Sequence, residues 1–505
     1  MCGFFISNST IVTKDHEDII SKSLSFRGPD GSSGLLQIGS WKSYHARLSI
    51  IDLSQGSNQP VINQDQSQLV FNGEILNYKE LGFKYFDQEY FSDTFLLNDL
   101  ILNKKLDLKE LDGFFAFVFV NGQGDLEYAC RDKFGVKPLF YLRNKNEIAF
   151  SSEPSALKNI FNCSLNENAI EEYQIFRAPI FSQSFYNEIR EVSPGSCYIN
   201  GNYFDLAHEL SVKSNKASET ELRSAIKNGV KSRCVSDVPI GLLLSKGIDS
   251  NLIRFFGNFK AFYSVGFDGD EDIKFLEQQD IRNLNIIKVN NEDFKEAFNY
   301  LLSLRQEPMS VPNEVMLYIV AKKAKEDGIK VLLSGEGADE FFAGYDRIFL
   351  WASKQKELHV NEFLSLYAYG EVEENSPIFR KVNDIFESCT LETVFDKIRW
   401  FFIRFHMPVL FRRLDFSLMA AGVEGREPIA NSHLFEICKT LDCSDLLLRN
   451  LGKRPLREEL AKYMGSEFAF ERKVGFPVDL KEVFDSADGK TSYDLWFEKN
   501  LEILR

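Results

Sequence analysis

Hydrophobic residues in the first two hundred positions occur in short runs that are separated by turn residues. The segments 34–41, 114–120 and 138–143 are rich in aromatic and branched aliphatic residues, and Gly, Asn and Asp punctuate the chain between such runs. This pattern predicts β-strands joined by turns. Residues 115–120 are almost entirely apolar, which predicts a strand that is covered on both faces.

A different periodicity begins after a polar stretch at residues 211–216, which we interpret as a linker. Ser218 opens the helix-capping sequence Ser-Glu-Thr-Glu, and Leu222, Ile226 and Val230 follow at helical spacing. Aliphatic strands then alternate with helices, which predicts a parallel sheet flanked by helices. The strands are expected at residues 240–244, 261–265, 285–289 and 329–333, with one helix after the first of them and another near 315–325. From about residue 345 onward we expect mainly helices.

Length and composition indicate a soluble protein of more than one domain. A chain of 505 residues is too long for one ordinary core, and we place the domains at residues 2–205 and 218–505. The chain is 44% hydrophobic and 26% charged, and no apolar run approaches the roughly 18 residues that cross a bilayer. The N-terminus lacks the basic flank and long apolar segment of a signal peptide. We therefore expect a cytoplasmic protein without a membrane partner.

Charge and cysteine spacing exclude several classes of function. The net charge of -15 disfavours nucleic acid as a partner, because phosphate backbones favour basic surfaces. Anionic small substrates remain open, since a local Lys/Arg cluster can reverse the overall field. The cysteines, which lie at positions 2, 130, 163, 197, 234, 389, 438 and 443, include no C-x-x-C pair. Their spacing supports neither a zinc site nor a disulfide framework, and we interpret most of them as buried small hydrophobes.

A short polar loop follows the aliphatic run 240–244. It contains Ser245, Lys246, Gly247, Asp249 and Ser250, and helical apolar spacing resumes after it. Ligands of doubly wound sheets bind beyond the carboxyl ends of the strands, and backbone N–H groups at a helix start form an anion site. The loop does not match the Walker phosphate motif. Taken alone, it is equally compatible with phosphate binding and with an ordinary strand-to-helix turn.

A second polar loop follows the aliphatic strand that ends near residue 333. It places Glu336, Asp339 and Glu340 at what should be the same edge of the sheet. Carboxylates beside a phosphate-binding loop suit Mg²⁺ that bridges to a nucleotide. The alternative is a charged surface turn with a helix cap. This alternative is less convincing because two polar loops follow strands of one sheet and should meet at one edge.

The two loops together carry a resemblance to a known family. The sequence from Ser245 to Ser250 resembles the S-G-G-x-D-S pyrophosphate loop of ATP pyrophosphatases that adenylate a carboxylate, and Ser334 to Glu340 with Gly344 and Tyr345 resembles the matching segment of the asparagine synthetases. The resemblance implies that a substrate carboxylate attacks the α-phosphate of ATP, which gives an acyl-adenylate and pyrophosphate. Residues implied to hold the leaving pyrophosphate and its Mg²⁺ are Ser245, Gly247, Asp249 and Ser250, with Asp339 as a second metal ligand. Residues implied to lie near the base and ribose are Leu244, Val265 and Gly335, next to Ser334, while Glu336 and Asp339 face the acceptor or the metal.

Lys246 departs from the family pattern, which usually has glycine at that position. A lysine does not adopt positive φ as easily as glycine does. Its side chain could reach the pyrophosphate as a point charge or point away to solvent, and an altered ATP site is the third alternative. We expect that Lys246 is tolerated and that ATP binds.

Cys2 is the second residue that suggests chemistry. Removal of the initiator methionine would leave this cysteine as the first residue, with its thiol next to its own α-amine. An α-amine with a pKa near 7.7–8.0 can act as the base for such a nucleophile. A cysteine after Met1 is by itself unremarkable, so the interpretation depends on the segments downstream.

Those segments resemble the class II glutamine amidotransferases, which are N-terminal-nucleophile glutaminases. The matches occur in family order through the first half of the chain. They are Arg27-Gly-Pro-Asp-Gly31, His45-Ala-Arg-Leu-Ser-Ile-Ile-Asp52, Gln59-Pro60, Phe71-Asn-Gly-Glu-Ile-Leu-Asn-Tyr78, Ser92-Asp-Thr94, the segment 131–141 and Ser151-Ser-Glu153. Phe95 replaces the glutamate that is common after Ser-Asp-Thr.

The resemblance assigns a role to each residue type. Arg47 would clamp the α-carboxylate of glutamine in a fork geometry, while Glu74 and Asp93 would receive its ammonium. Attack by the Cys2 sulfur on the amide builds an oxyanion, which Asn72 and the N–H of Gly73 would stabilise by about 3–4 kcal/mol per donor. Taken alone, each of these residues is more simply explained as part of a surface ion pair or a turn. The occurrence of all the matching segments in family order argues against this simpler explanation.

Resemblance to the asparagine synthetase family covers nearly the whole chain. It continues through Gln306-Glu-Pro308, Asp415, the segment 422–428 and the segment 472–476. It implies an N-terminal-nucleophile hydrolase domain of α+β class, with two antiparallel sheets between helices. An α/β ATP-pyrophosphatase domain with a parallel sheet and a helical C-terminal part would follow. The implied enzyme is a carbon–nitrogen ligase with glutamine as amido donor and with ATP and Mg²⁺ as cofactors, in which ammonia passes internally.

The sequence leaves the identity of the acceptor carboxylate open. Family frequency favours aspartate, which would give asparagine. Gln306, where aspartate is usual, and Asn431, also an aspartate position, favour another carboxylate such as a sugar acid of surface polysaccharides. Relatives that close β-lactam rings typically lack the N-terminal cysteine, so Cys2 argues against that activity. A degenerate scaffold protein, supported by Lys246, and a free glutaminase are the remaining alternatives, and a homodimer is one possible assembly.

Overall fold

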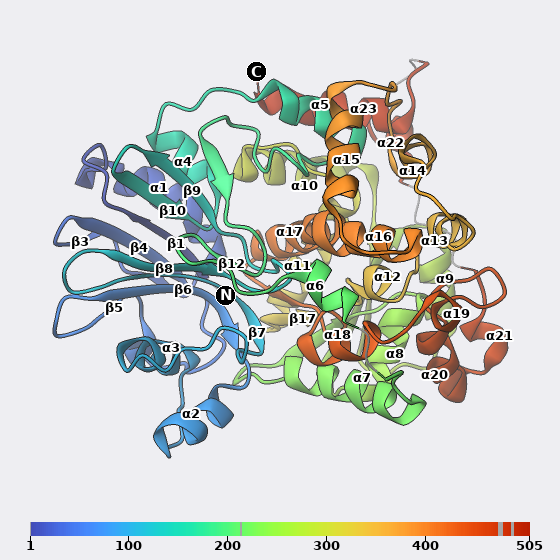
Figure 1. Cartoon of the computed structure of the whole chain (residues 1–505), viewed down its shortest axis with the longest axis horizontal. Coiled ribbons are helices and arrows are strands. Elements are labelled where there is room, and N and C mark those ends of the chain that lie inside the picture. Colours follow the sequence, from blue (N-terminus) through green and yellow to red (C-terminus); the bar gives the residue numbers. More distant parts are fainter. Residues whose placement is uncertain (1, 213–214, 473–477, 486–488, 505) are drawn as a thin grey trace.

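The computed structural model describes residues 2–212, 215–472, 478–485 and 489–504. The first two hundred residues form one side of the molecule in Figure 1 and the later residues form the other. Residues 213–214 of the predicted linker at 211–216 lie outside the described residues. Helix α6 (Leu206–Ser211) ends at the first position of this linker, and α7 (Glu219–Arg233) begins after its last position.

Two antiparallel sheets form the centre of the first domain. The first sheet has the order β11 (Ile189–Glu191), β9 (Phe140–Asn144), β10 (Glu147–Ser151), β1 (Cys2–Ser7), β4 (Trp41–Arg47) and β2 (Gly31–Ser32), with β3 (Leu36–Ile38) also paired to β4. The second has the order β13 (Gly201–Asn202), β12 (Ser196–Cys197), β8 (Leu126–Arg131), β7 (Gly113–Val120), β6 (Gln68–Ile75) and β5 (Val61–Ile62). A shared core that includes Phe4, Ile6, Val70 and Val118 joins the two sheets face to face.

Helices cover the outer faces of this sandwich, so the predicted fold class of the first domain is confirmed (Figure 1). The helices are α1 (Glu17–Leu24), α2 (Tyr78–Phe86), α3 (Asp93–Leu102), α4 (Pro154–Ile160) and α5 (Glu167–Phe176), with 3₁₀ turns at Lys14–His16, Ser25–Arg27 and Gln55–Ser57. Helices α1 and α4 contact the first sheet, and α3 contacts the second. Strand β7 is buried at every position after Gly113, as its apolar sequence predicted.

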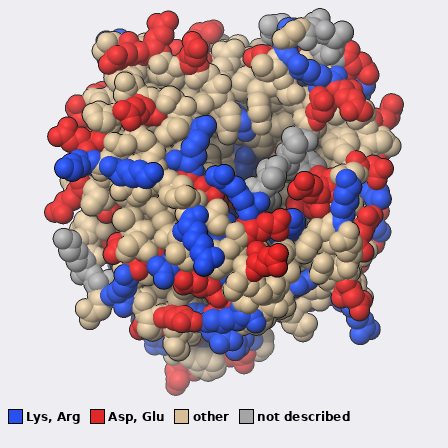
Figure 2. Space-filling view, turned by 90° about the vertical axis from the view of Figure 1, so that its right-hand side faces the viewer, with Lys and Arg blue, Asp and Glu red and all other residues tan. Residues whose placement is uncertain are grey.

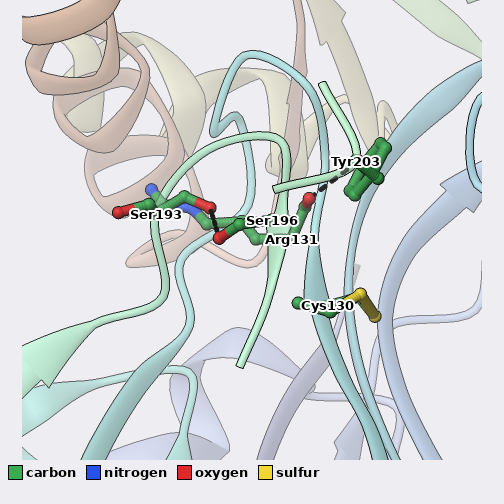
Figure 3. The surroundings of a disulfide bond; sticks show 6 residues. Cys130, Arg131, Ser193, Ser196 and Tyr203 are labelled. Carbon is green, nitrogen blue, oxygen red and sulfur yellow. Dashed lines mark hydrogen bonds between the residues drawn. A yellow bond between two sulfur atoms is a disulfide. The ribbon is translucent and has the colours of Figure 1, made fainter. Parts of the chain in front are cut away.

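One disulfide corrects the prediction from cysteine spacing. Cys130 of β8 and Cys197 of β12 are bonded, and both are buried (Figure 3). The two residues are directly opposite in the antiparallel register, with their Cα atoms 4.0 Å apart. Spacing missed this bond because the partners are 67 residues apart and only strand pairing brings them together. The hydroxyl of Tyr203 next to it donates to the carbonyl of Arg131 at 2.8 Å.

A parallel sheet forms the centre of the second domain and confirms the predicted α/β class. Its order is β16 (Leu284–Val289), β15 (Ala261–Phe267), β14 (Ile240–Leu243), β17 (Val331–Leu333) and β18 (Glu424–Arg426). The helices between its first four strands are α8 (Ile248–Phe256), α9 (Glu271–Glu277), α10 (Asn291–Arg305) and α11 (Asn313–Glu326). The capping box at Ser218 is present, because its hydroxyl accepts from the N–H of Glu221 at 3.2 Å.

The chain beyond residue 345 is helical as expected, with one exception. Its helices are α13 (Asp346–Ala352), α14 (Val360–Tyr367), α15 (Pro377–Ser388), α16 (Val394–Phe401), α17 (Met407–Met419), α18 (Ser432–Cys438), α19 (Cys443–Leu446), α20 (Arg454–Met464), α21 (Ser466–Ala469), α22 (Leu480–Val483) and α23 (Ser492–Leu501). A π-helical turn, Phe402–His406, joins α16 to α17, α12 (Ala338–Phe341) precedes this region, and a 3₁₀ turn at Glu502–Leu504 follows it. Strand β18 is the exception: three residues were too short to predict as a strand, and pairing with β17 defines it.

The two domains meet over a buried interface. Phe134 of the first domain packs against Phe341 and Phe435 of the second, with ring centroids 5.3 and 5.5 Å apart. The Arg27 guanidinium lies 2.8 Å from the Asp415 carboxylate, and both side chains are buried. Within the described ranges, no helix combines the length and apolar character that crossing a membrane requires.

Candidate active sites

Cys2 begins β1 in the middle of the first sheet. It lies directly opposite Arg47 of β4, and its backbone N–H donates to Oδ1 of Asn72 at 3.0 Å. Its side chain is buried, and burial raises the pKa of the thiol. A thiol with a raised pKa is a weak nucleophile until a base removes its proton, so the site requires a base such as the freed α-amine.

Asn72 and Gly73 of β6 lie next to Cys2. Nδ2 of Asn72 is buried and has no hydrogen-bond partner among the described residues. Gly73 has φ of +145°, and a Cβ at this position would lie 2.1 Å from the carbonyl oxygen of Phe114, so only glycine fits. A buried amide donor without a partner is costly, and it is suited to an oxygen that develops negative charge.

Arg47 is held by the loop that follows β4. Its Nη1 donates to the carbonyl of Ser54 at 2.6 Å and to Oδ1 of Asn58 at 2.9 Å, and Nη2 donates to the carbonyl of Asp52. These bonds use three of the five N–H donors of a guanidinium. The other two are available for a carboxylate, in a side chain that is fixed in place by its neighbours.

Glu74 and Asp93 are buried carboxyl groups at the same end of the first domain. Asp93 accepts from the backbone N–H of Ile75 at 2.9 Å and of Thr94 at 2.8 Å. Burial raises the pKa of Asp93 to about 6. Burial and the charges of Asp93 and Glu424 raise the pKa of Glu74. Ionising two buried carboxyl groups is unfavourable unless a positive charge lies beside them. The pair therefore favours a bound cation, such as the ammonium of an amino acid.

The raised pKa of Asp93 predicts a pH-dependent affinity for glutamine. Above about pH 6 the carboxylate is charged and attracts the ammonium, and below that pH it binds a proton and loses the attraction. We expect the Kd of glutamine for the Cys2→Ala variant to rise about tenfold between pH 7 and pH 5, as measured by calorimetry. This variant removes the nucleophile, so titration of the thiol does not contribute. A Kd that stays constant over this range would contradict the prediction.

The second candidate site lies at the carboxyl edge of the parallel sheet. A cavity of about 610 Å³ occupies this edge between the loops that follow β14 and β17. All of the residues predicted for the nucleotide and acceptor site line it: Leu244, Ser245, Gly247, Asp249, Ser250, Val265, Ser334, Gly335, Glu336 and Asp339. The loops meet because β14 and β17 are adjacent and parallel, with Leu242 opposite Leu333. A Cβ at Gly335 would lie 2.7 Å from the Cβ of Asp249.

Internal hydrogen bonds fix the first loop and aim the start of α8 at the cavity. The N–H of Gly247 donates to Oγ of Ser245 at 3.0 Å, and the N–H of Ser245 donates to Oγ of Ser250 at 3.2 Å. Nδ2 of Asn251 donates to the carbonyls of Ser245 and Gly247, both at 2.9 Å. An ordered loop that leads into a helix N-terminus is suited to bind a phosphate group.

Lys246 fits this loop without backbone strain. It is not among the described non-glycine residues with positive φ, so the usual glycine is not required here. Its Nζ lies 2.6 Å from Oε1 of Glu471, next to an adjoining cavity of about 490 Å³. Figure 2 views the molecule from the side of α9, α13 and α21, and acidic and basic side chains border a hollow on that face. The side chain therefore pairs with a half-exposed glutamate, and Lys246 is absent from the lining of the 610 Å³ cavity.

Lys453 is a site residue that the sequence did not reveal. Its Nζ lies 2.8 Å from Oδ2 of Asp249 and 2.8 Å from Oδ2 of Asp339, and the side chain is buried. Gly344 packs so closely here that a Cβ would lie 2.2 Å from Cε of Lys453. Lys453 is more than 100 residues distant in sequence from both aspartates, and no local signal separates it from the other lysines of the chain.

Asp249 and Asp339 were also predicted as metal ligands. The described residues contain no group of three or more His, Cys, Asp or Glu side chains that could hold a metal ion. Mg²⁺ is commonly bound through only one or two carboxylates together with substrate phosphates. Two carboxylates at a cavity of nucleotide size fit that mode.

The departures at Gln306 and Asn431 have structural explanations. Gln306 ends α10 with φ of 56°, and its Oε1 accepts from Nδ2 of Asn159 of the first domain at 3.0 Å. Asn431 caps α18, because its Oδ1 accepts from the N–H of Leu434 at 2.9 Å. Asparagine and aspartate are equally good helix caps. Neither residue lines the 610 Å³ cavity. In the segment 472–476, residues 473–476 lie outside the described residues.

Comparison with known proteins connects both sites to families. The family model of asparagine synthase matches residues 221–499, and that of the glutamine amidotransferase domain matches residues 1–206. The chain is 32% identical to glutamine-hydrolysing asparagine synthetase 1 of Bacillus subtilis over 68% of this chain, and it spans 59% of that relative's length. It is 27% identical to asparagine synthetase B of Escherichia coli over 94% of this chain and 82% of that protein. It is 28% identical to the amidase chyE of Penicillium rubens over 63% of this chain and 53% of that protein.

Proposed function

Because the chain belongs to the asparagine synthase family, we propose that it hydrolyses glutamine at Cys2 and uses the ammonia to amidate a carboxylate that ATP has activated. The family match confirms the predicted class of enzyme, a carbon–nitrogen ligase with glutamine as amido donor. The observation that carries the proposal is the cavity at the sheet edge. All ten residues predicted for nucleotide and acceptor binding line it. The same chain holds a buried cysteine beside an amide donor that has no partner in the described ranges.

In the proposed first half-reaction, residues 2–205 act as a glutaminase. Arg47 binds the α-carboxylate of glutamine with its two remaining N–H donors, and Glu74 and Asp93 bind the ammonium. The Cys2 sulfur, once its own α-amine has taken the proton, attacks the side-chain amide. Asn72 and Gly73 donate to the oxyanion. Ammonia leaves, and water then cleaves the thioester to give glutamate.

In the proposed second half-reaction, residues 218–505 activate the acceptor. The acceptor carboxylate attacks the α-phosphorus of ATP, and the pyrophosphate leaves toward the N-terminus of α8. Ser245, Gly247 and Ser250 bind that anion, and Lys453 adds a positive charge beside it. Mg²⁺, held by Asp249 and Asp339, would supply charge neutralisation on the phosphates. Ammonia then attacks the acyl-adenylate, and AMP leaves.

We propose aspartate as the acceptor and asparagine as the product. The family match supports it, and neither Gln306 nor Asn431 lines the cavity that would hold the acceptor. One observation favours a larger acid, such as a sugar acid. A second cavity of about 280 Å³ adjoins the first through Arg177 and Arg413 and is lined by further basic residues, including Arg404 and Arg412.

Product analysis tests the proposal. The purified protein is incubated with glutamine, ATP, Mg²⁺ and either aspartate or one member of a panel of carboxylic acids, and the products are identified by mass spectrometry. We expect glutamate, AMP, pyrophosphate and asparagine. Amide formation from a sugar acid but not from aspartate would support the larger acceptor. Glutamate formation without any amide would refute the synthetase and leave a glutaminase.

A further inference from the structure

One buried glutamate at the domain boundary has no role in the chemistry described so far. Glu427 follows β18 directly and is 2% exposed. Neither oxygen of its carboxyl group has a hydrogen-bond partner among the described residues. Burying a polar group without a partner is unfavourable by roughly 1–3 kcal/mol, so native proteins rarely retain one without a functional reason.

The position of Glu427 places it at the edge of the synthetase cavity. Strand β18 pairs in parallel with β17, so that Arg426 lies opposite Leu333. The N–H of Ser334 donates to the carbonyl of Arg426 at 2.9 Å. Glu427 therefore leaves the sheet at the same level as Ser334 and Gly335, which line the cavity. Glu336, another lining residue, is one of its electrostatic neighbours.

Residues of the first domain also lie near this glutamate. Lys137 and Asp132 are electrostatic neighbours of Glu427. The Lys137 ammonium is fully buried and lies 4.6 Å from the ring centroid of Phe114. The carbonyl of Phe114 is the group that Gly73 of the glutaminase site contacts closely. Lys137 and Phe114 therefore lie between Glu427 and the strand that carries Gly73.

A line of buried charges continues from there to Cys2. Nζ of Lys137 lies 3.3 Å from Oδ1 of Asp415, and Arg27 lies 2.8 Å from Oδ2 of the same carboxylate. Nε of Arg27 donates to the carbonyl of Cys2 at 3.1 Å. Although burial alone would raise the pKa of Asp415, its two cationic partners lower it. Asp415 is thus a paired carboxylate, whereas the carboxyl of Glu427 has no hydrogen-bond partner in the described part of the chain.

The protonation of Glu427 suits a ligand that both donates and accepts hydrogen bonds. Burial raises the pKa of Glu427 to about 8, although Lys137 acts in the opposite direction. Near neutral pH the carboxyl group therefore carries a proton in most of the molecules and offers both an O–H donor and oxygen acceptors. Ammonia has one lone pair and three N–H groups, and it is small enough for a site without a large cavity.

We propose that the carboxyl group of Glu427 binds ammonia between the Cys2 site and the cavity where the acceptor is activated. The inference rests on the proposed function, because only a glutamine-dependent synthetase must move ammonia between these two sites. Binding at Glu427 would hold ammonia at the edge of the synthetase cavity until an acyl-adenylate is present. The side chain acts on the efficiency of transfer and takes no part in either half-reaction.

The coupling of the two half-reactions tests the proposal. Amide formed per glutamate formed is compared in the wild type, Glu427→Gln and Glu427→Leu, with glutamine as the nitrogen source. We expect Glu427→Leu to lower this ratio about fivefold to tenfold, the effect of one lost hydrogen bond to a charged or polar group. Glutamate formation and ATP–pyrophosphate exchange should change less than about twofold, since neither half-reaction touches Glu427. The near-isosteric Glu427→Gln variant should fold and give a smaller decrease.

A second readout separates binding from structure. With ammonium chloride replacing glutamine, Glu427→Leu should raise the KM for ammonium about fivefold and leave kcat unchanged, because a binding group is lost. Glu172→Gln is the control, since Glu172 is a buried carboxyl group whose oxygens accept from Phe181 and Ser182. A coupling ratio and an ammonium KM that both stay at the wild-type values would overturn the proposal. A parallel loss of both half-reactions and of thermal stability would also overturn it, in favour of a structural role. If the wild type forms no amide from any acid, the proposed function itself fails.

Discussion

Replacing Cys2 with alanine is expected to abolish glutamine-dependent amide formation and to leave ammonia-dependent formation intact. Cys2 is buried, lies opposite Arg47 in the pairing of β1 with β4, and donates its backbone N–H to Asn72. Loss of a covalent nucleophile reduces turnover by at least about 1,000-fold in comparable acyl-transfer enzymes. The synthetase cavity lies in the other domain and does not include Cys2, so it should continue to use ammonium chloride.

Release of glutamate and formation of the amide product measure the two activities in parallel. Cys163→Ala is the matched control, since Cys163 is a free cysteine of the same domain with no assigned role. This variant should keep both activities. Glutamate release by Cys2→Ala at the wild-type rate would exclude Cys2 as the nucleophile. A purified wild-type chain that retains Met1 and still hydrolyses glutamine would exclude the α-amine as its base.

Replacing Lys453 with methionine is expected to stop acceptor activation without affecting the glutaminase. The Lys453 ammonium contacts the carboxylates of both Asp249 and Asp339 at 2.8 Å. Its removal leaves two neighbouring negative charges at the phosphate cavity, and breaking a buried ion pair costs about 3–5 kcal/mol. ATP–pyrophosphate exchange should therefore fall by at least about 100-fold.

The control for this change lies on the same helical segment. Lys462 of α20 is a half-exposed lysine that pairs with Glu459 at 2.8 Å and also contacts the exposed Glu219, and it does not line the 610 Å³ cavity. Lys462→Met should keep ATP–pyrophosphate exchange within about threefold of the wild type. Exchange at the wild-type rate in Lys453→Met would show that the two aspartates do not need this cation. Loss of glutaminase activity as well would indicate a folding defect.

Local patterns were sufficient where neighbouring residues decide the structure. The apolar run of β7 and the capping box at Ser218 were both read from a few consecutive residues. The two loops of the synthetase cavity were also predictable from local sequence, since each directly follows its own strand. Their meeting at one edge followed from the rule that parallel strands present their carboxyl ends together.

Other features depended on partners that are distant in sequence. The spacing of Cys130 and Cys197 does not predict their bond, because only the pairing of β8 with β12 brings them into bonding distance. The three-residue strand β18 is too short to show a period, and its place in the sheet depends on β17. That strand in turn positions Glu427, so no local pattern marks this residue either.

The sequence alone determined the class of both domains, the alternation of strands and helices in the second domain, and the family, because apolar periodicity and short motifs are read from nearby residues. Tertiary structure alone decided that Lys453 joins Asp249 to Asp339 and that Lys246 pairs with Glu471. It also decided that Glu427 is buried without a hydrogen-bond partner among the residues that the structure describes. Charge pairing and burial depend on which side chains the folded chain brings within a few ångströms of one another. Spacing along the sequence does not encode those distances.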